Sequence, residues 1–228
     1  MFNFFRNKQK FNYGDNPIEI NFVEDFLNMS DLIKNSKVKL NFKLNRDLDF
    51  KDEMSYKNTS IKYNIYPVGC LEKVYFNACF DGNNHTISNV EIFNDKMYSY
   101  GDFSECGLFG YLKNAEIKNL NLKNIFVIGE HNTGILAGST EKSIIKNCII
   151  ENSQIEVISN NTKSNGLSLV LGKSYGFNEI DNIKYNVGIY LNKMDSYNEL
   201  IQISETDKIT NCVNTKFLDD KKILKKKL

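Results

Sequence analysis

A repeated pairing of a glycine with an asparagine constrains this chain more than any other sequence feature. In three segments the glycine precedes the asparagine by nine, nine and ten residues: Gly110 to Asn119, Gly138 to Asn147, and Gly172 to Asn182. A repeat of roughly 20–50 residues is typical of stacked supersecondary units, each of which needs its neighbours to bury its apolar face. Successive asparagines here are 28 and 35 residues apart. We therefore predict a solenoid.

The paired spacing carries this prediction, because the chain is rich in asparagine. The units open at Gly107, Gly134 and Gly166, and weaker echoes at Ile87–Asn89 and Ile209–Asn211 extend the register. The tripeptide Ile-x-Asn also occurs outside that register, for example at Ile150–Asn152. The tripeptide alone is therefore a weak signal, whereas the distance from glycine to asparagine is a specific one.

Each unit has the pattern of β-strands rather than of helices. Apolar and polar residues alternate over Ile117–Ile128, and Ile149–Ile158 and Ile183–Leu191 follow the same pattern. This period of two is typical of half-buried strands. Glycine and asparagine between the strands tolerate the left-handed backbone that a corner needs. Asparagines in one register can also stack and bond through their amides. We expect an all-β parallel solenoid.

Five segments resemble the GLUG-repeat family. They are Gly107–Tyr111, Gly134–Ser139, Cys79–Val90, Leu40–Asp49 and Tyr66–Gly69, with Tyr66 where the family often has tryptophan. The resemblance covers roughly residues 38 to 160 and continues in degenerate form to about 218. It implies a right-handed parallel β-helix of the pectin-lyase-like superfold. Many proteins of this family resemble exported surface proteins.

The chain divides into three parts. We predict an N-terminal segment with a capping helix at 1–37, the β-helix at 38–218, and a lysine-rich tail at 219–228. Within the first part, Pro17–Ile20 is a candidate strand and Glu24–Lys34 a candidate amphipathic helix, whose apolar face carries Phe26, Leu27, Ser30 and Ile33. Such a helix is expected over the open core at the end of a solenoid.

Charge and composition limit the partners and the compartment. Lys and Arg number 29 against 28 Asp and Glu, so no nucleic-acid partner is expected. No apolar run approaches the ~18–20 residues that span a bilayer, and the start of the chain lacks the apolar core of a signal peptide. We expect a cytoplasmic protein, or one exported without a recognisable signal, with a surface location implied by the resemblance. The register places Cys148 and Cys212 as small inward-facing hydrophobes.

Catalytic chemistry is not favoured by the sequence. His85 lies in a repeat turn, and His131 is flanked by loop residues. Glycoside hydrolysis needs two carboxylates ~5–9.5 Å apart, and aligning Glu91 with Asn121 and Ile149 leaves it without a partner. Asp47, Asp49, Asp52 and Glu53 form an acidic group that is a weak candidate for calcium. We expect no cofactor, no metal site and no catalytic residue.

The expected function is a non-catalytic binding or structural module, of bacterial or phage-related and adhesin-like type, that presents a flat face and corner loops to a protein or a glycan. The alternatives are an intracellular effector, immunity or counter-defence protein, and a carbohydrate-active hydrolase or lyase. Insertions in a solenoid project from its corners and often build the binding face. The candidate binding residues therefore lie in corner insertions: Tyr56, Tyr98, Tyr100, Asp102 and Tyr197.

Overall fold

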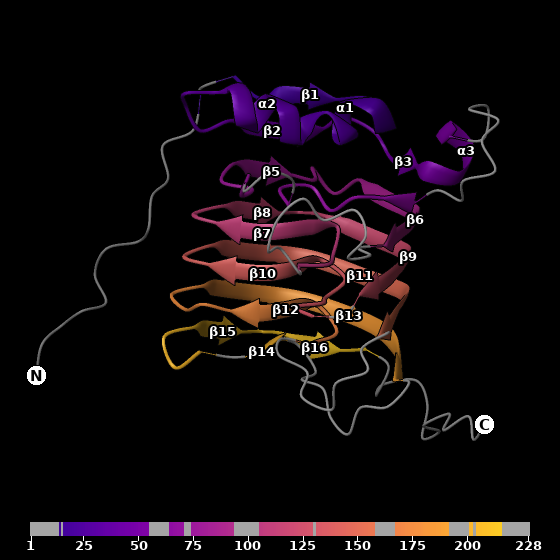
Figure 1. Ribbon diagram of the computed structural model, residues 1–228, viewed down its shortest axis with the longest axis vertical. Helices are drawn as coiled ribbons and strands as arrows, with labels where there is room; N and C mark the ends of the chain where they lie inside the picture. The colour runs from indigo at the N-terminus through magenta and orange to yellow at the C-terminus, as the bar shows by residue number, and fades with distance from the viewer. Residues whose placement is uncertain are drawn as a thin grey trace, which may run out of the picture.

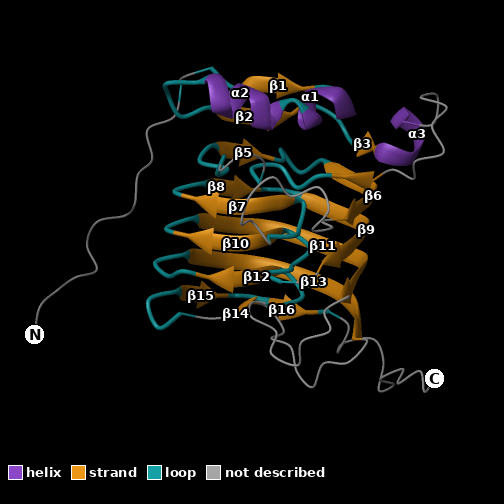
Figure 2. Ribbon diagram, viewed as in Figure 1, coloured by secondary structure: helices purple, strands orange, loops and turns teal. Residues whose placement is uncertain are grey.

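The computed structural model describes residues 14, 16–54, 64–70, 74–93, 105–129, 131–157, 167–191, 201–202 and 204–215. Over these residues the chain forms a parallel β-helix, with helices gathered at its N-terminal end (Figures 1 and 2). Every pairing between named strands is parallel, as the prediction required. None of the described helices has the length and apolar character needed to span a membrane.

Two sheets make up the solenoid. The larger, sheet A, contains β1 (Ile18–Ile20), β2 (Asn41–Leu44), β3 (Leu48–Asp49), β4 (Asn64–Ile65), β5 (Cys79–Asp81), β6 (Thr86–Phe93), β8 (Glu116–Lys118), β9 (Asn121–Gly129), β11 (Ile144–Val157), β13 (Glu179–Leu191), β15 (Lys208–Thr210) and β16 (Val213–Asn214). The smaller, sheet B, has the order β14 (Ile201–Gln202), β12 (Leu171–Ser174), β10 (Ala137–Glu141) and β7 (Phe109–Lys113). A single apolar core fills the space that these strands enclose.

The repeated glycines occupy one row of sheet B. Phe109 pairs with Ala137 and Ala137 with Leu171, so Gly110, Gly138 and Gly172 stack on successive rungs as predicted. Close packing explains the residue type. A Cβ on Gly138 would lie 2.5 Å from the amide nitrogen of Cys106 and 2.6 Å from the carbonyl oxygen of Asn132. Only glycine lets these backbones approach so closely.

The opening glycine of the third unit was placed incorrectly from the sequence. Bridges join Cys106 to Thr133 and Thr133 to Leu167, which aligns Gly107 and Gly134 with Ser168. Gly166 lies outside the described residues. The serine is accommodated with its hydroxyl donating to the carbonyl oxygen of Gly172, at 3.2 Å.

At three corners of the coils one residue has a left-handed backbone, although the coil that contains β13 lacks the third of them. The left-handed residues on successive coils are Asn114, Lys142 and Phe177 at the first corner, Asn119, Asn147 and Asn182 at the second, and Asn89, Asn124 and Asn152 at the third. All nine have φ between 48° and 59°. Asparagine tolerates this conformation better than other residues with side chains. Asn211 (φ 54°) continues the second corner, as expected from the Ile209–Asn211 echo.

One part of the predicted register was wrong. Asn89 does not align with Asn119, because Ser88 pairs with Lys123 and so places Asn89 beside Asn124 at the third corner. The interval from Asp81 to Thr86 is two residues longer than the matching interval from Lys118 to Asn121, which displaces the echo. Ile150–Asn152, which looked out of register, belongs to that third corner as well, because Glu151 pairs with Lys123 and so places Asn152 beside Asn124.

Asparagine side chains form ladders along two of the corners, as predicted. At the second corner, Nδ2 of Asn119 donates to Oδ1 of Asp81 (3.0 Å), Asn147 to Asn119 (3.0 Å) and Asn182 to Asn147 (2.9 Å). At the third corner, Asn124 donates to Asn89 (3.0 Å) and Asn89 to Asp49 (2.8 Å). Each rung is thus tied to the next outside the core as well as within it.

The ladder predicts unequal effects of two substitutions at Asn147. Asn147→Ala removes both amide hydrogen bonds and leaves a Cβ in the left-handed region, so we expect it to lower the free energy of unfolding by about 2 kcal/mol. Asn147→Gly removes the same bonds without the backbone strain, so we expect about 1 kcal/mol. Urea denaturation measures both. Equal losses for alanine and glycine would contradict the role given to the backbone conformation.

The N-terminal end is capped by helices, with one difference from the prediction. The segment forms two helices, α1 (Val23–Leu27) and α2 (Met29–Asn35), because Asn28 ends the first. Phe26 and Ile33 are buried as expected, but Met29 rather than Leu27 or Ser30 completes the buried face. The hydroxyl of Ser30 instead accepts a hydrogen bond from the amide of Gly69 (3.0 Å) and ties the cap to the next rung.

The polar segment after residue 49 begins with a third helix, α3 (Phe50–Met54), whose first side chain is fully buried. The cysteine predictions are confirmed for Cys148, which is fully buried, and Cys212 packs partly against the same core. Burial raises the pKa of the Cys148 thiol to about 12. None of the five cysteines, all of which the structure describes, forms a disulfide. The lysine-rich tail at 219–228 lies outside the described residues.

Candidate surface site on sheet B

A row of partly exposed aromatic and charged side chains lies on the outer face of sheet B. We name it the tyrosine strip, and it consists of Tyr75, Tyr111, Lys113, Glu141, Lys173 and Tyr175. None of its members is fully buried, and the ring of Tyr175 is 47% exposed. The rungs of the solenoid bring these residues together from segments up to 100 positions apart in the chain.

Strand alternation and register set these positions. In β7 the side chain of Leu112 enters the core, so those of Tyr111 and Lys113 point outward. Lys113 pairs with Glu141 on the neighbouring strand β10, and Thr140 pairs with Ser174 on β12, which places Tyr175 next in the row of Glu141. Tyr75 joins from the other side, since Phe76 bridges to Leu112.

The three rings contact one another in sequence. The centroids of Tyr75 and Tyr111 are 4.9 Å apart in an edge-to-face arrangement, and those of Tyr111 and Tyr175 are 5.5 Å apart. Lysine ammonium groups lie over these rings: Nζ of Lys113 is 5.0 Å from the centroid of Tyr75, and Nζ of Lys173 is 5.0 Å from that of Tyr175. Both geometries are attractive for aromatic rings.

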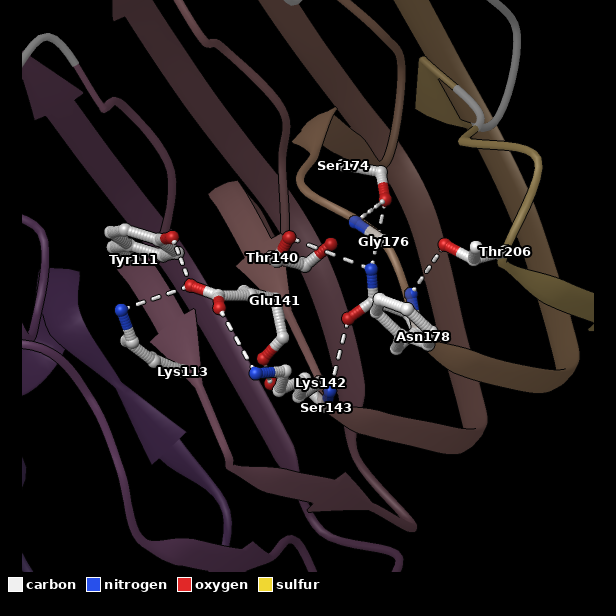
Figure 3. A network of polar contacts seen from close by, with 11 residues as sticks. Tyr111, Lys113, Thr140, Glu141, Lys142, Ser143, Ser174, Gly176, Asn178 and Thr206 are labelled. Carbon is white, nitrogen blue, oxygen red and sulfur yellow. Dashed lines mark hydrogen bonds and ion pairs between the residues drawn. The ribbon is translucent and has the colours of Figure 1, made fainter. Parts of the chain in front are cut away.

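Glu141 joins the strip into one polar network (Figure 3). Its Oε2 accepts a hydrogen bond from the hydroxyl of Tyr111 at 2.8 Å and lies 3.0 Å from Nζ of Lys113. Lys142 approaches Oε1 at 3.8 Å. Burial acts to raise the pKa of Glu141, but the hydrogen bonds from Tyr111 and Lys113 and the nearby positive charges outweigh it and hold the pKa below its ordinary value. Burial and this hydrogen bond raise the pKa of Tyr111.

The hydrogen bond from Tyr111 should help to set the pKa of Glu141. A carboxylate whose pKa is lowered in the folded state stabilises the fold above its unfolded pKa and loses that contribution as pH falls through the folded value. Tyr111→Phe removes a hydrogen bond to the ionised form, so we expect the pKa of Glu141 to rise toward its ordinary value. Carbon NMR titration of the Glu141 carboxyl measures this. Tyr175→Phe is the control, and an unchanged Glu141 pKa in Tyr111→Phe would contradict the assignment.

The corner that carries Tyr175 is held by a dense set of hydrogen bonds, most of them drawn in Figure 3. The buried Asn178 donates from Nδ2 to the hydroxyl of Ser174 (2.9 Å) and accepts at Oδ1 from the amide of Ser143 (3.0 Å). The amide of Phe177 donates to the hydroxyl of Thr206 (3.0 Å). Phe177 is 59% exposed with φ 59°, at a corner position where an earlier rung has asparagine. A bulky residue rarely adopts this backbone, and such strain tends to occur at functional sites.

A buried carboxylate, Glu105, interrupts one row of the strip. Ser139 separates Tyr111 from Lys173 in register, and its hydroxyl donates to Oε1 of Glu105 at 3.3 Å. Nδ2 of Asn132 donates to the same oxygen at 3.4 Å. Burial raises the pKa of Glu105 above its ordinary value. Glu105 thus lies over Ser139, the residue between Tyr111 and Lys173 in this row.

The five binding residues predicted from the sequence all lie outside the described residues: Tyr56, Tyr98, Tyr100, Asp102 and Tyr197. Sequence reasoning missed the tyrosine strip, although a signal was present. Counting from the second glycine of each unit, the first position after it is Tyr111, Ser139 or Lys173, and the third is Lys113, Glu141 or Tyr175. Both positions face outward, so the aligned repeats could have been read as the rows of a surface.

His85, Asp47 and Asp49 take part in contacts between neighbouring rungs. His85 is half-buried, and its Nδ1 lies 3.2 Å from Oδ1 of Asp47, which also accepts from the amide of Thr86 (2.8 Å). Asp49 accepts from Asn89 at the end of a corner ladder. These contacts give both acids a part in joining rungs. Among the described residues, no three His, Cys, Asp or Glu side chains are grouped so that they could hold a metal ion.

The predicted alignment of Glu91 with Asn121 and Ile149 is wrong. Glu91 pairs with Phe126, and Phe126 with Gln154, because of the two-residue shift described above. Within the paired strand positions that the structure describes, no two carboxylates occupy adjacent places in a row. Glu116 and Glu179 come nearest to this arrangement, with Ile144 between them.

Comparisons with known proteins give limited similarity. No family model matches the chain. Halomucin from Haloquadratum walsbyi is 35% identical over 78 residues, which is 34% of this chain and 1% of that protein. A crystal structure of a Bacteroides ovatus protein assigned as an immunoglobulin A1 protease covers 86% of this chain and 74% of its own, with 15% identity and a TM-score of 0.49. At this level neither similarity assigns the chain to a family.

Proposed function

We propose that this chain is a non-catalytic β-solenoid binding module of the GLUG-repeat type, adhesin-like in character, and that the tyrosine strip is its binding surface. The observation that carries the proposal is the contact between three tyrosine rings on the outer face of a parallel sheet. The sequence repeat explains the core and the corners of the fold, but it does not require aromatic residues at these outward positions.

Two physical arguments favour a binding role for the strip. Tyrosine supplies a large contact area at a low cost in side-chain entropy, and aromatic residues dominate the energetics of binding surfaces. The strip is also ordered before any ligand arrives, since Tyr111 is fixed by its hydrogen bond to Glu141 and Tyr175 lies under Lys173. A preorganised surface loses less entropy when it binds.

The register of the acids supports a role without catalysis. Hydrolysis of a glycoside by two carboxylates requires them ~5–9.5 Å apart, and acids at adjacent places in one row, on rungs ~4.8 Å apart, are the simplest way to meet this requirement. In the rows of the described strands, lysines, apolar residues or uncharged polar residues separate the acids instead. In one such row, Asp81, Lys118, Lys146 and Asp181 follow one another.

A binding screen with a matched control tests the proposal. The labelled full chain, its Tyr175→Ser variant and its Tyr66→Ser variant are applied to a glycan array and to a peptide display library. Tyr66 is a suitable control because its ring is 45% exposed, close to the 47% of Tyr175, and it lies beside the Gly107 end of the coil. We expect ligands that Tyr175→Ser loses and Tyr66→Ser retains, recovered chemically unchanged after incubation. Turnover of a captured ligand, or equal binding by all three proteins, would contradict the proposal.

A further inference from the structure

We propose that the tyrosine strip binds an acidic polysaccharide, with a uronate ring stacked on Tyr111 and Tyr175 and its carboxylate paired with Lys113 or Lys173. This inference rests on the proposed function and adds the chemical class of the ligand. It is carried by the charges over the rings, the spacing of the rings and the position of the strip within the sheet.

The residues of the tyrosine strip carry more positive than negative charge. Lys113, Lys142 and Lys173 bring three positive charges to the strip, against the carboxylate of Glu141. Two of the three ammonium groups lie over ring faces. A neutral ligand that stacked on the rings would displace these cations without compensation. An anionic ligand would let each flexible lysine exchange its contact with a ring for an ion pair.

The spacing of the tyrosine rings favours a chain of sugars over an extended peptide. The ring centroids follow one another at 4.9 and 5.5 Å, although Tyr111 and Tyr175 lie two rungs apart, and this spacing is comparable to the length of one sugar ring. Side chains on one face of an extended peptide recur at about 6.6 Å, out of step with this row. A chain of sugars can therefore place successive rings on successive tyrosines, whereas an extended peptide cannot.

The known ways of binding a peptide fit the strip less well than the binding of a sugar does. Strand addition needs a free edge, but β10 lies between β7 and β12, and β7, the last strand of sheet B, forms backbone hydrogen bonds on its outer side with Val68, Gly69 and Phe76. Recognition of phosphopeptides relies on the forked guanidinium of arginine, and the strip supplies lysine. A sugar uses what the strip does supply: flat rings for its apolar face and a carboxylate, Glu141, whose oxygens can accept hydrogen bonds from hydroxyl groups.

The test uses the full chain and three probes of equal length: an oligomer of β-linked glucuronate, the corresponding cello-oligosaccharide, which differs only in having CH₂OH in place of the carboxylate, and oligoglutamate. Dissociation constants are measured by calorimetry at low and high salt. We expect glucuronate to bind at least about tenfold more tightly than either other probe, with an affinity that falls as salt rises. Tyr175→Ser and Lys173→Gln should each weaken glucuronate binding about tenfold. Tyr66→Ser and Lys123→Gln, on exposed residues elsewhere, should not change it.

Three results would overturn the inference. Equal affinity for the cello-oligosaccharide would show that the carboxylate has no part in recognition. Equal affinity for oligoglutamate would identify the strip as a surface for acidic peptides. A failure of the wild-type chain to bind any probe would remove the acidic glycan as its ligand. In each case the proposed function stands or falls separately, on whether Tyr175→Ser and Tyr66→Ser differ in the binding screen.

Discussion

Gly138→Ala is expected to lower the free energy of unfolding by about 3 kcal/mol or more, although it adds only one methyl group. The new Cβ would lie 2.5 Å from the amide nitrogen of Cys106 and 2.7 Å from Cα of Glu105. These atoms belong to the backbone of the neighbouring coil and cannot move aside as a flexible side chain would. Overpacking a core usually costs about 1–3 kcal/mol, and contact with backbone on two sides places this site at the upper limit.

Gly14→Ala provides the control, because the nearest atom to its added Cβ is a carbonyl oxygen at 3.9 Å, an ordinary contact. Chemical denaturation followed by circular dichroism compares both variants with the wild type. If Gly138→Ala were as stable as Gly14→Ala, the paired glycines would have some role other than allowing coils to approach, and the explanation of the repeat would fail.

Phe26→Ala is expected to destabilise the chain by about 3–5 kcal/mol through loss of the N-terminal cap. The ring of Phe26 is fully buried, and its centroid lies 5.9 Å from those of Phe50 and Phe80 and 6.2 Å from that of Phe109. These partners come from α3, β5 and β7, so one side chain joins the cap to the first coils on both sheets. Truncation would leave a cavity that helices and sheets cannot both collapse to fill.

Leu32→Ala is the matched control, since Leu32 lies on the same pair of helices but is 42% exposed. We expect its effect to stay within about 0.5 kcal/mol. Thermal unfolding with both variants and the wild type gives the comparison. A loss for Phe26→Ala no greater than that for Leu32→Ala would mean that the helices rest on the solenoid without sealing its core.

The sequence predicted the parts of the fold in which backbone geometry restricts the residue type. Only glycine fits where coils touch at Gly138, and asparagine is favoured in the left-handed corner at Asn147, so both recur at a fixed distance that can be read directly. The amphipathic cap was predictable for a related reason, because burial of Phe26 and Ile33 leaves a helical period. The break at Asn28 leaves that period almost unchanged and was therefore missed.

The strand register outside the repeated glycine-to-asparagine spacing was harder to predict, because corners differ in length from one coil to the next. Two extra residues before Thr86 moved Asn89 to another corner and changed the neighbours of Glu91. The candidate site was missed for a different reason. Outward residues such as Tyr111 and Tyr175 are not restricted by the core, so they do not repeat in kind, and only strand pairing shows that they meet.

The location of ligand binding is the central claim, and hydroxyl-radical footprinting tests it most directly because it reports the exposure of individual side chains. Oxidation of Tyr175, Phe177 and Tyr66 is measured by mass spectrometry with and without glucuronate oligomer or any ligand from the screen. These residues are 47%, 59% and 45% exposed in the unbound chain, so all three should react. A bound ligand is expected to protect Tyr175 from oxidation and to leave the oxidation of Tyr66 unchanged. Protection of Tyr66 with continued oxidation of Tyr175 would contradict the central claim.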